Sequence, residues 1–335
     1  MRTEENKLKN LGIQLPIFPL TSVGSFPKFD YIKKGRSCFE KGEIGANDLL
    51  TLEKKATEEW IQFQEEIGID ILVDGEMYRG DMVAYFAEKL PGFKEGGFVR
   101  SYGNRFYKKP VISEAVGWEK PLTVDWWKFA QSLTRKPVKG MLTGPYTIMD
   151  WSFNEHYKDR EAAALALAKV IRKEVEALID AGAKIIQVDE PACSVRPKEL
   201  PLVVRTMDIV TRDLPAYFVT HICYGDFEKI YPEMNEIPVD NYDLEMSNSE
   251  NDLLNCFRKV HMPKDLSAGI VDVHTHQIEE HALLMKRLRD ILEVVSPSQL
   301  WVDPDCGLKT RTVDEAKEKL KAVVKAVKAL RAQSS

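Results

Sequence analysis

Short apolar runs alternate with longer segments that have the hydrophobic period of a helix along the whole chain. Residues 159–181 show the helical pattern clearly, because Leu167, Ile171 and Leu178 would lie on one face and Gly182 follows as a C-terminal cap. The runs predict strands at residues 17–25, 71–76, 139–145, 184–191, 218–224, 243–247, 267–274 and 300–306. The periodic segments predict helices at residues 49–67, 79–90, 159–181, 200–211, 279–294 and 313–330, and one that begins at 251.

The fold class that this alternation predicts is α/β. Eight strands that alternate with helices match a single (β/α)8 TIM barrel that forms one catalytic domain over residues 1–335. The competing fold, an open doubly wound sheet, would need a glycine-rich phosphate loop after an early strand, and Gly24 alone does not supply one. Residues 92–122 interrupt the alternation after the second unit and are predicted to be an extended insertion. Residues 1–16 and 27–45 are predicted to be excursions near the barrel rim.

Composition excludes several classes of function. The 335 residues carry 47 Lys and Arg against 52 Asp and Glu, so no basic field favours nucleic acid or an anionic membrane as a partner. No apolar run approaches the roughly 20 residues of a membrane span, and the polar N-terminus does not resemble a signal peptide. Five scattered cysteines do not form a disulfide framework, which favours a reducing, cytoplasmic setting.

The barrel prediction makes a specific statement about chemistry, because active sites of this fold lie at the C-terminal ends of the strands. Thiols, imidazoles and carboxylates gather at those positions. In chain order the predicted strand ends carry Gly24–Ser25, Glu76, Thr143–Gly144–Pro145, Asp189–Glu190, His221 with Cys223, Glu245, His274 and Cys306.

Four of these side chains make a zinc set. His221 and Cys223 are two residues apart, a spacing that places both on one face of a strand. With Glu245 and Cys306 they give one imidazole, two thiolates and one carboxylate, which are ligand types that suit Zn²⁺. Each residue alone also has an ordinary explanation, since buried cysteines are common and a strand-end Glu usually pairs with a base. Together they predict one zinc ion per chain. Cys38 and Cys256 are interpreted as structural, and so is Cys193, although its place near the mouth leaves a role open.

Such a site carries one negative charge overall, and its thiolates weaken the metal as an activator of water. It can still bind a substrate thiol and displace its proton, which otherwise leaves with a pKa of about 8.5. The sequence therefore favours thiol alkylation over hydrolysis.

The remaining strand-end groups would hold the rest of an amino-acid thiol. Glu76 and Asp189 are candidates for its ammonium group, and the N–H groups of Val23, Gly24 and Ser25 for its carboxylate. A turn without any ligand explains the Gly24–Ser25 and Asp189–Glu190 positions about equally well. His274 is a candidate general acid, and the neighbouring His276 is given no role.

Seven segments are similar to the catalytic C-terminal barrel of cobalamin-independent methionine synthase, over residues 15–329. They are VGSFP at 23–27, DGEMYRGDMVAYF at 74–86, SYGNRFYKKP at 101–110, KPVKGMLTGPYTIMDWSF at 136–153, IIQVDEPA at 185–192, HICY at 221–224 and WVDPDCGLKTR at 301–311. The resemblance implies a zinc enzyme that transfers a methyl group to homocysteine and makes methionine. It places His221, Cys223, Glu245 and Cys306 as zinc ligands, Val23–Ser25, Glu76 and Asp189 at homocysteine, and His274 as proton donor.

The chain departs from the family pattern on the methyl-donor side. The family's N-terminal barrel, which helps to bind the polyglutamyl folate, has no counterpart here. Val195 replaces an acidic folate contact, and Phe106 replaces a small cysteine. Arg105 and Trp151 do match folate-contact positions. The preferred donor is therefore methylcobalamin or a methylated corrinoid protein, with 5-methyltetrahydrofolate as the alternative.

Two other functions stay open at this point. One is a zinc-dependent alkyltransferase for another thiol such as coenzyme M, which would leave Glu76 and Asp189 without an ammonium group to bind. The other is a non-catalytic, zinc-stabilised partner of a corrinoid protein. The oligomeric state does not follow from the sequence.

Overall fold

A computed structural model describes residues 3–100, 106–223, 225–247 and 252–333. The chain forms two compact units. The first consists of residues Met1–Tyr78, Trp126–Lys139 and Asn241–Ser335, and the second of Arg79–Asp125 and Gly140–Asp240. The prediction of a single catalytic domain over 1–335 stays a prediction.

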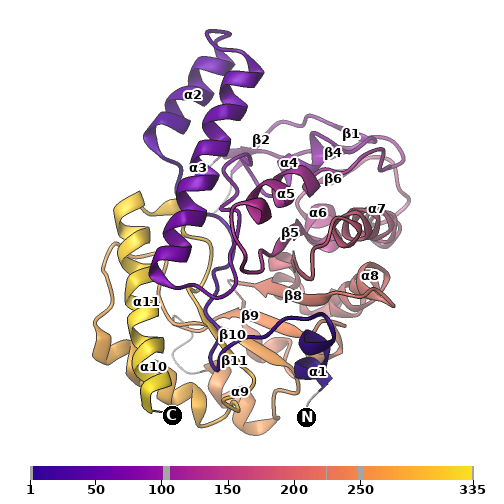
Figure 1. The fold of residues 1–335 in the computed structure, drawn as a ribbon. Helices are drawn as coiled ribbons and strands as arrows, with labels where there is room; N and C mark the ends of the chain where they lie inside the picture. The colour runs from indigo at the N-terminus through magenta and orange to yellow at the C-terminus, as the bar shows by residue number, and fades with distance from the viewer. Residues whose placement is uncertain (1–2, 101–105, 224, 248–251, 334–335) are drawn as a thin grey trace. The chain divides into compact units, whose positions relative to one another are not determined.

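In the first unit, three buried parallel strands pair in the order β9–β10–β11. Leu20 continues this order through a parallel bridge to Val302 in β11, and Leu72 is bridged in the same sense to Val138. The strands are β9 (Asn241–Glu245), β10 (Asp265–Gly269) and β11 (Leu300–Asp303). The helices are α1 (Thr3–Asn10), α2 (Asp30–Glu40), α3 (Ala46–Ile67), α9 (Asp252–Lys259), α10 (His281–Leu292) and α11 (Val313–Gln333), with a short η6 (Leu308–Thr310). Figure 1 shows α10 beside α11, and α2 folded back along α3.

In the second unit, β7 pairs in parallel with β5 on one side and with β8 on the other, and all three strands are buried. The strands are β5 (Gly140–Thr143), β7 (Ile185–Asp189) and β8 (Tyr217–Ile222). The helices include α4 (Ala84–Ala87), α6 (Pro145–Asp150), α7 (Arg160–Asp180) and α8 (Leu200–Thr211), with η2 (Pro191–Val195), η3 (Pro197–Glu199), η4 (Phe227–Lys229) and η5 (Glu233–Glu236). Helix α5 (Val124–Ser132) begins in this unit and continues into the first. Buried parallel strands joined by helices are the pattern of an α/β fold.

Residues 93–112 hold four of the short strands, in two small sheets of the second unit. β1 (Phe93–Lys94) pairs antiparallel with β4 (Val111–Ile112), which pairs in parallel with β6 (Phe153–Asn154). β2 (Phe98–Arg100) and β3 (Phe106–Lys108) form an antiparallel ladder.

Two predicted strands are reduced to single bridges because side chains take over their backbone hydrogen bonds. The amide of Gln64, on α3, accepts from Val73 N at 3.0 Å and donates to Val73 O at 2.9 Å, so residues 71–76 need no regular ladder there. In the segment 17–25, Leu20 N donates to an Asp70 carboxylate oxygen at 2.8 Å.

Local caps also move several predicted boundaries. The helix predicted at 79–90 is only α4, because Asp81 accepts from Val83 N and Ala84 N and so starts the helix late. β5 ends at Thr143 rather than 145, because Pro145 occupies the first turn of α6. Residues 30–40, which belong to the predicted excursion at 27–45, form α2.

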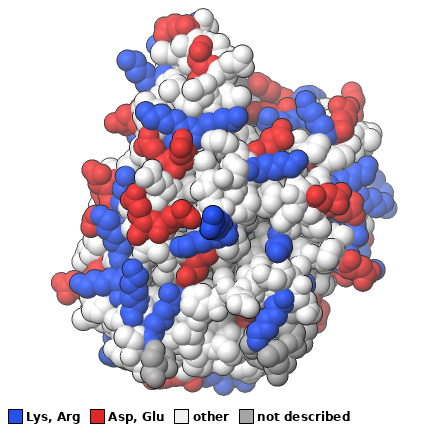
Figure 2. Space-filling view, viewed as in Figure 1, with Lys and Arg blue, Asp and Glu red and all other residues white. Residues whose placement is uncertain are grey.

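The helix pattern at 159–181 is confirmed by α7. Asp159 caps its N-terminus by accepting from Ala162 N at 2.7 Å, and Gly182 follows its end with a positive φ of 107°. Within the described part of the chain, no helix has both the length and the apolar character that crossing a bilayer requires. Acidic and basic side chains are interspersed over the face drawn in Figure 2.

Candidate metal centre and substrate site

The end of β8 presents an imidazole and a thiol. His221 is the next-to-last residue of the strand and Cys223 follows it, and both are buried. The buried hydroxyl of Thr220, the residue before His221, donates to Val188 O of β7 at 2.8 Å, which ties this strand end to its neighbour. His221 and Cys223 therefore have the two-residue spacing that places side chains on one face of a strand.

Two of the four predicted zinc ligands come together in the second unit. One donor atom each from His221 and Cys223 lie within 4.8 Å of each other. In the first unit, Glu245, the last residue of β9, is buried and Cys306 is half-buried. One imidazole and two thiols are a donor set that fits Zn²⁺ and leaves a fourth position for a carboxylate or a substrate.

The Cys306 loop is held by a carboxylate that the sequence reasoning did not single out. Asp305 is fully buried, and its Oδ1 accepts from Met246 N and Ser247 N at 3.1 and 3.0 Å. Burial raises the pKa of Asp305 to about 8 against the effect of the bonds to Ser247, and the nearby Glu245 charge raises it further. The sequence signal that could have identified Asp305 was its position directly before Cys306, a predicted zinc ligand.

The predicted carboxylate-binding turn lies against the same loop. Val23 and Gly24 are buried, Ser25 is half-buried, and Phe26 N donates to Gly75 O at 3.1 Å. Gly307 packs so closely on Ser25 that a Cβ at 307 would stand far nearer than 3.0 Å to the Ser25 hydroxyl oxygen. The turn that carries Ser25 is therefore next to the residue that follows Cys306.

Glu76, one of the two predicted ammonium ligands, has an unusual backbone. Its φ is 58°, a left-handed value that costs a non-glycine residue energy. Asp74 fixes this turn, because its carboxylate accepts from Glu76 N at 2.9 Å and from the Tyr78 hydroxyl at 2.9 Å. Retained backbone strain of this kind is typical of functional positions.

Asp189, the other predicted ammonium ligand, ends β7 and is buried. Gln187 donates to its Oδ1 at 2.7 Å, and Gly144 N donates to its backbone carbonyl at 2.8 Å. The next residue, Glu190, is also buried and was overlooked as a functional residue. Its carboxylate accepts from Tyr146 N, Thr147 N and the Thr147 hydroxyl, and burial raises its pKa to about 7 despite these bonds.

His274, the predicted proton donor, is exposed and follows β10 in a loop. The backbone N–H of His274 donates to Asp272 Oδ1 at 2.7 Å. The loop is tied to α11 by the buried Lys319, which lies 3.0 Å from Glu279. His276 pairs with Glu315 at 2.8 Å. The role of His274 stays a prediction.

On the predicted methyl-donor side, Trp151 is half-buried at the end of α6. The preceding residue, Asp150, pairs with Arg160 at 2.6 Å and with Arg196 at 3.0 Å. Arg105 lies outside the described residues, as does the side chain of Phe106.

Cys193 and Cys256 are buried and Cys38 is half-buried. Burial of Cys193 raises the pKa of its thiol, which keeps the sulfur protonated and unreactive.

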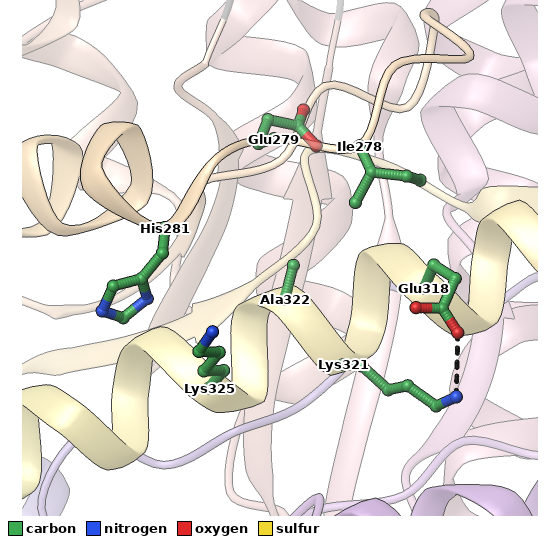
Figure 3. Close-up of a pocket in the computed structure, with 7 residues that line it drawn as sticks. All are labelled: Ile278, Glu279, His281, Glu318, Lys321, Ala322 and Lys325. Atoms are coloured by element: carbon green, nitrogen blue, oxygen red, sulfur yellow. Dashed lines mark hydrogen bonds and ion pairs between the residues drawn. The ribbon is translucent and has the colours of Figure 1, made fainter.

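A cavity of about 230 Å³ in the first unit is separate from the predicted site, because none of the predicted site residues is among those that line it (Figure 3). It is lined by Ile278, Glu279, His281, Glu318, Lys321, Ala322 and Lys325. Glu318 and Lys321 pair with each other at 2.8 Å, and Glu279 is held by Lys319, so these charges are already compensated.

The chain is similar to a family of known proteins over most of its length. The family model described as "Cobalamin-independent synthase, Catalytic domain" matches residues 18–329. The 5-methyltetrahydropteroyltriglutamate–homocysteine methyltransferase of Chelativorans sp. (strain BNC1) is 39% identical over 98% of this chain and 44% of its own length. The protein of the same name from Xylella fastidiosa (strain 9a5c) is 40% identical over 98% of this chain and 45% of its own length. The chain thus spans less than half of these relatives.

Two solved structures of similar fold each cover 95% of the chain. A B12-independent methionine synthase from Shewanella sp. W3-18-1, in complex with selenomethionine, has a TM-score of 0.84 and 27% identity, over 95% of this chain and 99% of that one. A putative vitamin-B12 independent methionine synthase from Listeria monocytogenes has a TM-score of 0.78 and 22% identity, over 95% and 99%. With these neighbours the predicted α/β TIM-barrel fold class is confirmed.

Proposed function

Because the chain belongs to the cobalamin-independent synthase family through its catalytic domain, we propose that it transfers a methyl group to homocysteine and makes methionine. The observation that carries this proposal is the imidazole and thiol of His221 and Cys223, whose donor atoms lie within 4.8 Å of each other at the end of β8. Thiolate-rich zinc sites suit thiol substrates better than water, so the donor set and the family agree on the class of reaction.

The proposed methyl donor is 5-methyltetrahydropteroylglutamate. Sequence reasoning preferred a corrinoid, and that preference conflicts with the relatives, which are named for 5-methyltetrahydropteroyltriglutamate. That preference rested on departures from the family pattern, such as Val195 and Phe106, while the family model still matches residues 18–329. No finding supports a corrinoid partner.

In the proposed site, His221, Cys223 and Cys306 would hold zinc together with Glu245 or a substrate group. Bound there, zinc would supply a Lewis acid that lowers the pKa of the substrate thiol. Asp189 and Glu76 would hold the homocysteine ammonium group, and the N–H groups of residues 23–25 its carboxylate.

The reaction balances without a redox partner. The homocysteine sulfur loses its proton and forms a bond to the methyl carbon, while the bond between that carbon and the donor nitrogen breaks. The leaving nitrogen must gain a proton, and His274 is the proposed source. Its exposure in a loop outside the strand leaves it accessible to a bound donor.

The decisive experiment measures methionine formed by the zinc-loaded protein from homocysteine, with 5-methyltetrahydropteroyltriglutamate and with methylcobalamin in separate reactions. We expect product with the first donor. Turnover with methylcobalamin alone would restore the corrinoid assignment, and absence of product with both would refute the methyltransferase proposal.

Two single cysteine variants distinguish loss of a metal ligand from general damage to the fold. Cys306→Ala should lose zinc and activity together, whereas Cys256→Ala removes a buried thiol from α9 and should retain both. Equal zinc content in the two variants would contradict the ligand assignment.

A further inference from the structure

One buried carboxylate ties together the ends of three neighbouring strands in the first unit. Asp305 follows β11 and is fully buried. Its Oδ1 accepts hydrogen bonds from the N–H groups of Met246 and Ser247 at 3.1 and 3.0 Å, and its Oδ2 accepts from the Ser247 hydroxyl. These bonds fix the backbone immediately after Glu245, the last residue of β9.

Asp305 is itself held in place from β10. Its N–H donates to Val271 O at 3.0 Å. Gly269 lies so close that a Cβ at this position would stand 2.5 Å from both the Cα and the Oδ1 of Asp305. The side chain therefore has no room to shift toward β10, and its orientation toward β9 is imposed from both sides.

This arrangement couples two residues of the proposed metal set. Glu245 precedes the two N–H groups that bind the carboxylate, and Cys306 follows the carboxylate directly. Groups that orient metal ligands without touching the metal typically contribute about 10- to 100-fold to metal affinity. They do so because a ligand fixed in advance loses little freedom on binding.

We propose that Asp305 is a positioning residue that sets the backbone of Glu245 and of Cys306 for a zinc ion. This inference rests on the proposed function, because it takes those two residues as ligands. A purely structural tie would support folding equally well but would leave zinc affinity of the folded protein unchanged.

The test measures the zinc dissociation constant of folded protein by competition with a chromophoric chelator, and the ligand atoms by X-ray absorption at the zinc edge. Asp305→Ala should weaken binding about 10- to 100-fold. Asp305→Asn should weaken it less, because its amide oxygen can still accept from both N–H groups. Gly269→Ala, which leaves the carboxylate intact but displaces it, should resemble Asp305→Ala.

Asp70 provides a matched control in the same unit. Its carboxylate also accepts from a backbone N–H, that of Leu20, and it pairs with Arg331, but it lies beside none of the proposed ligands. Asp70→Ala should lower stability and leave zinc affinity at the wild-type value.

Wild-type zinc affinity in folded Asp305→Ala would overturn the inference. If that variant does not fold, wild-type affinity in both Asp305→Asn and Gly269→Ala would overturn it instead. Weakened zinc binding in the variants supports it even where the wild-type protein makes no methionine with either donor, a result that would refute the proposed reaction alone.

Discussion

Gly144 is the position where a single methyl group should do the most damage to the proposed homocysteine site. An ideal Cβ at residue 144 would lie 2.5 Å from Cγ of Glu190 and closer still to its carboxyl group. Glu190 has no free space to enter, because it is fully buried and its carboxylate accepts three hydrogen bonds from Tyr146 and Thr147. Gly144→Ala must therefore push the carboxylate away from the first turn of α6.

The cost follows from the bonds that this displacement breaks. Loss of hydrogen bonds to a charged, buried group costs about 1.5–3 kcal/mol each, and overpacking adds about 1–3 kcal/mol. Partial relaxation and the lower entropy of Ala in the unfolded chain offset some of this, the latter by about 0.4–1 kcal/mol. We expect the free energy of unfolding to fall by about 3 kcal/mol, which corresponds to a Tm lower by about 4 °C for a chain of this length.

Chemical denaturation followed by circular dichroism measures the loss. Gly140→Ala, at the start of the strand that precedes Gly144, is the matched control: its Cβ would meet flexible side-chain atoms of Leu178 and Ile186 at 3.1 and 3.5 Å, so it should cost about 1 kcal/mol or less. Since Gly144 N donates to the backbone carbonyl of Asp189, Gly144→Ala should also raise the KM for homocysteine.

A double variant identifies the cause. Glu190→Asp shortens the side chain, so the added methyl group should cost much less in that background than in the wild type. Displacement of the Glu190 carboxylate is refuted if the free energy of unfolding of Gly144→Ala is within about 0.5 kcal/mol of the wild-type value. It is also refuted if the added methyl group costs the same with Glu and with Asp at residue 190.

Three further outcomes are expected from buried charges. Glu174→Gln should lower the free energy of unfolding by about 2 kcal/mol in urea denaturation, because one carboxylate oxygen accepts from Thr123 N at 2.7 Å and the other from Trp118 Nε1 at 2.8 Å, and the amide nitrogen that replaces one of them cannot accept; an unchanged midpoint would contradict this. Lys319→Met should cost about 3–5 kcal/mol by calorimetry, because it leaves Glu279 buried and unpaired, and adding Glu279→Gln should recover part of the loss rather than increase it. Burial, followed by a nearby Arg, lowers the pKa of Lys28 from 10.5 to about 8. Between pH 8 and pH 10.5 the unfolded chain therefore binds more protons than the folded chain, so the free energy of unfolding rises with pH across this window. Lys28→Met should lack that rise, and parallel stability curves for the two proteins would contradict it.

The sequence by itself determined the alternation of strands and helices and the residue types at the strand ends. Side-chain period and chain order are local properties, so α7 and the strand positions of β7, β8 and β11 could be read directly. The H-x-C spacing likewise predicted that His221 and Cys223 share one face, because alternation along a strand needs no distant partner.

Only the tertiary structure decided which distant residues act together. Gln64 replaces a strand ladder at Val73, and Asp305 binds N–H groups 58 and 59 residues away. Hydrogen bonds of this kind depend on where folding brings two segments, and a single sequence carries no period or motif that reports them.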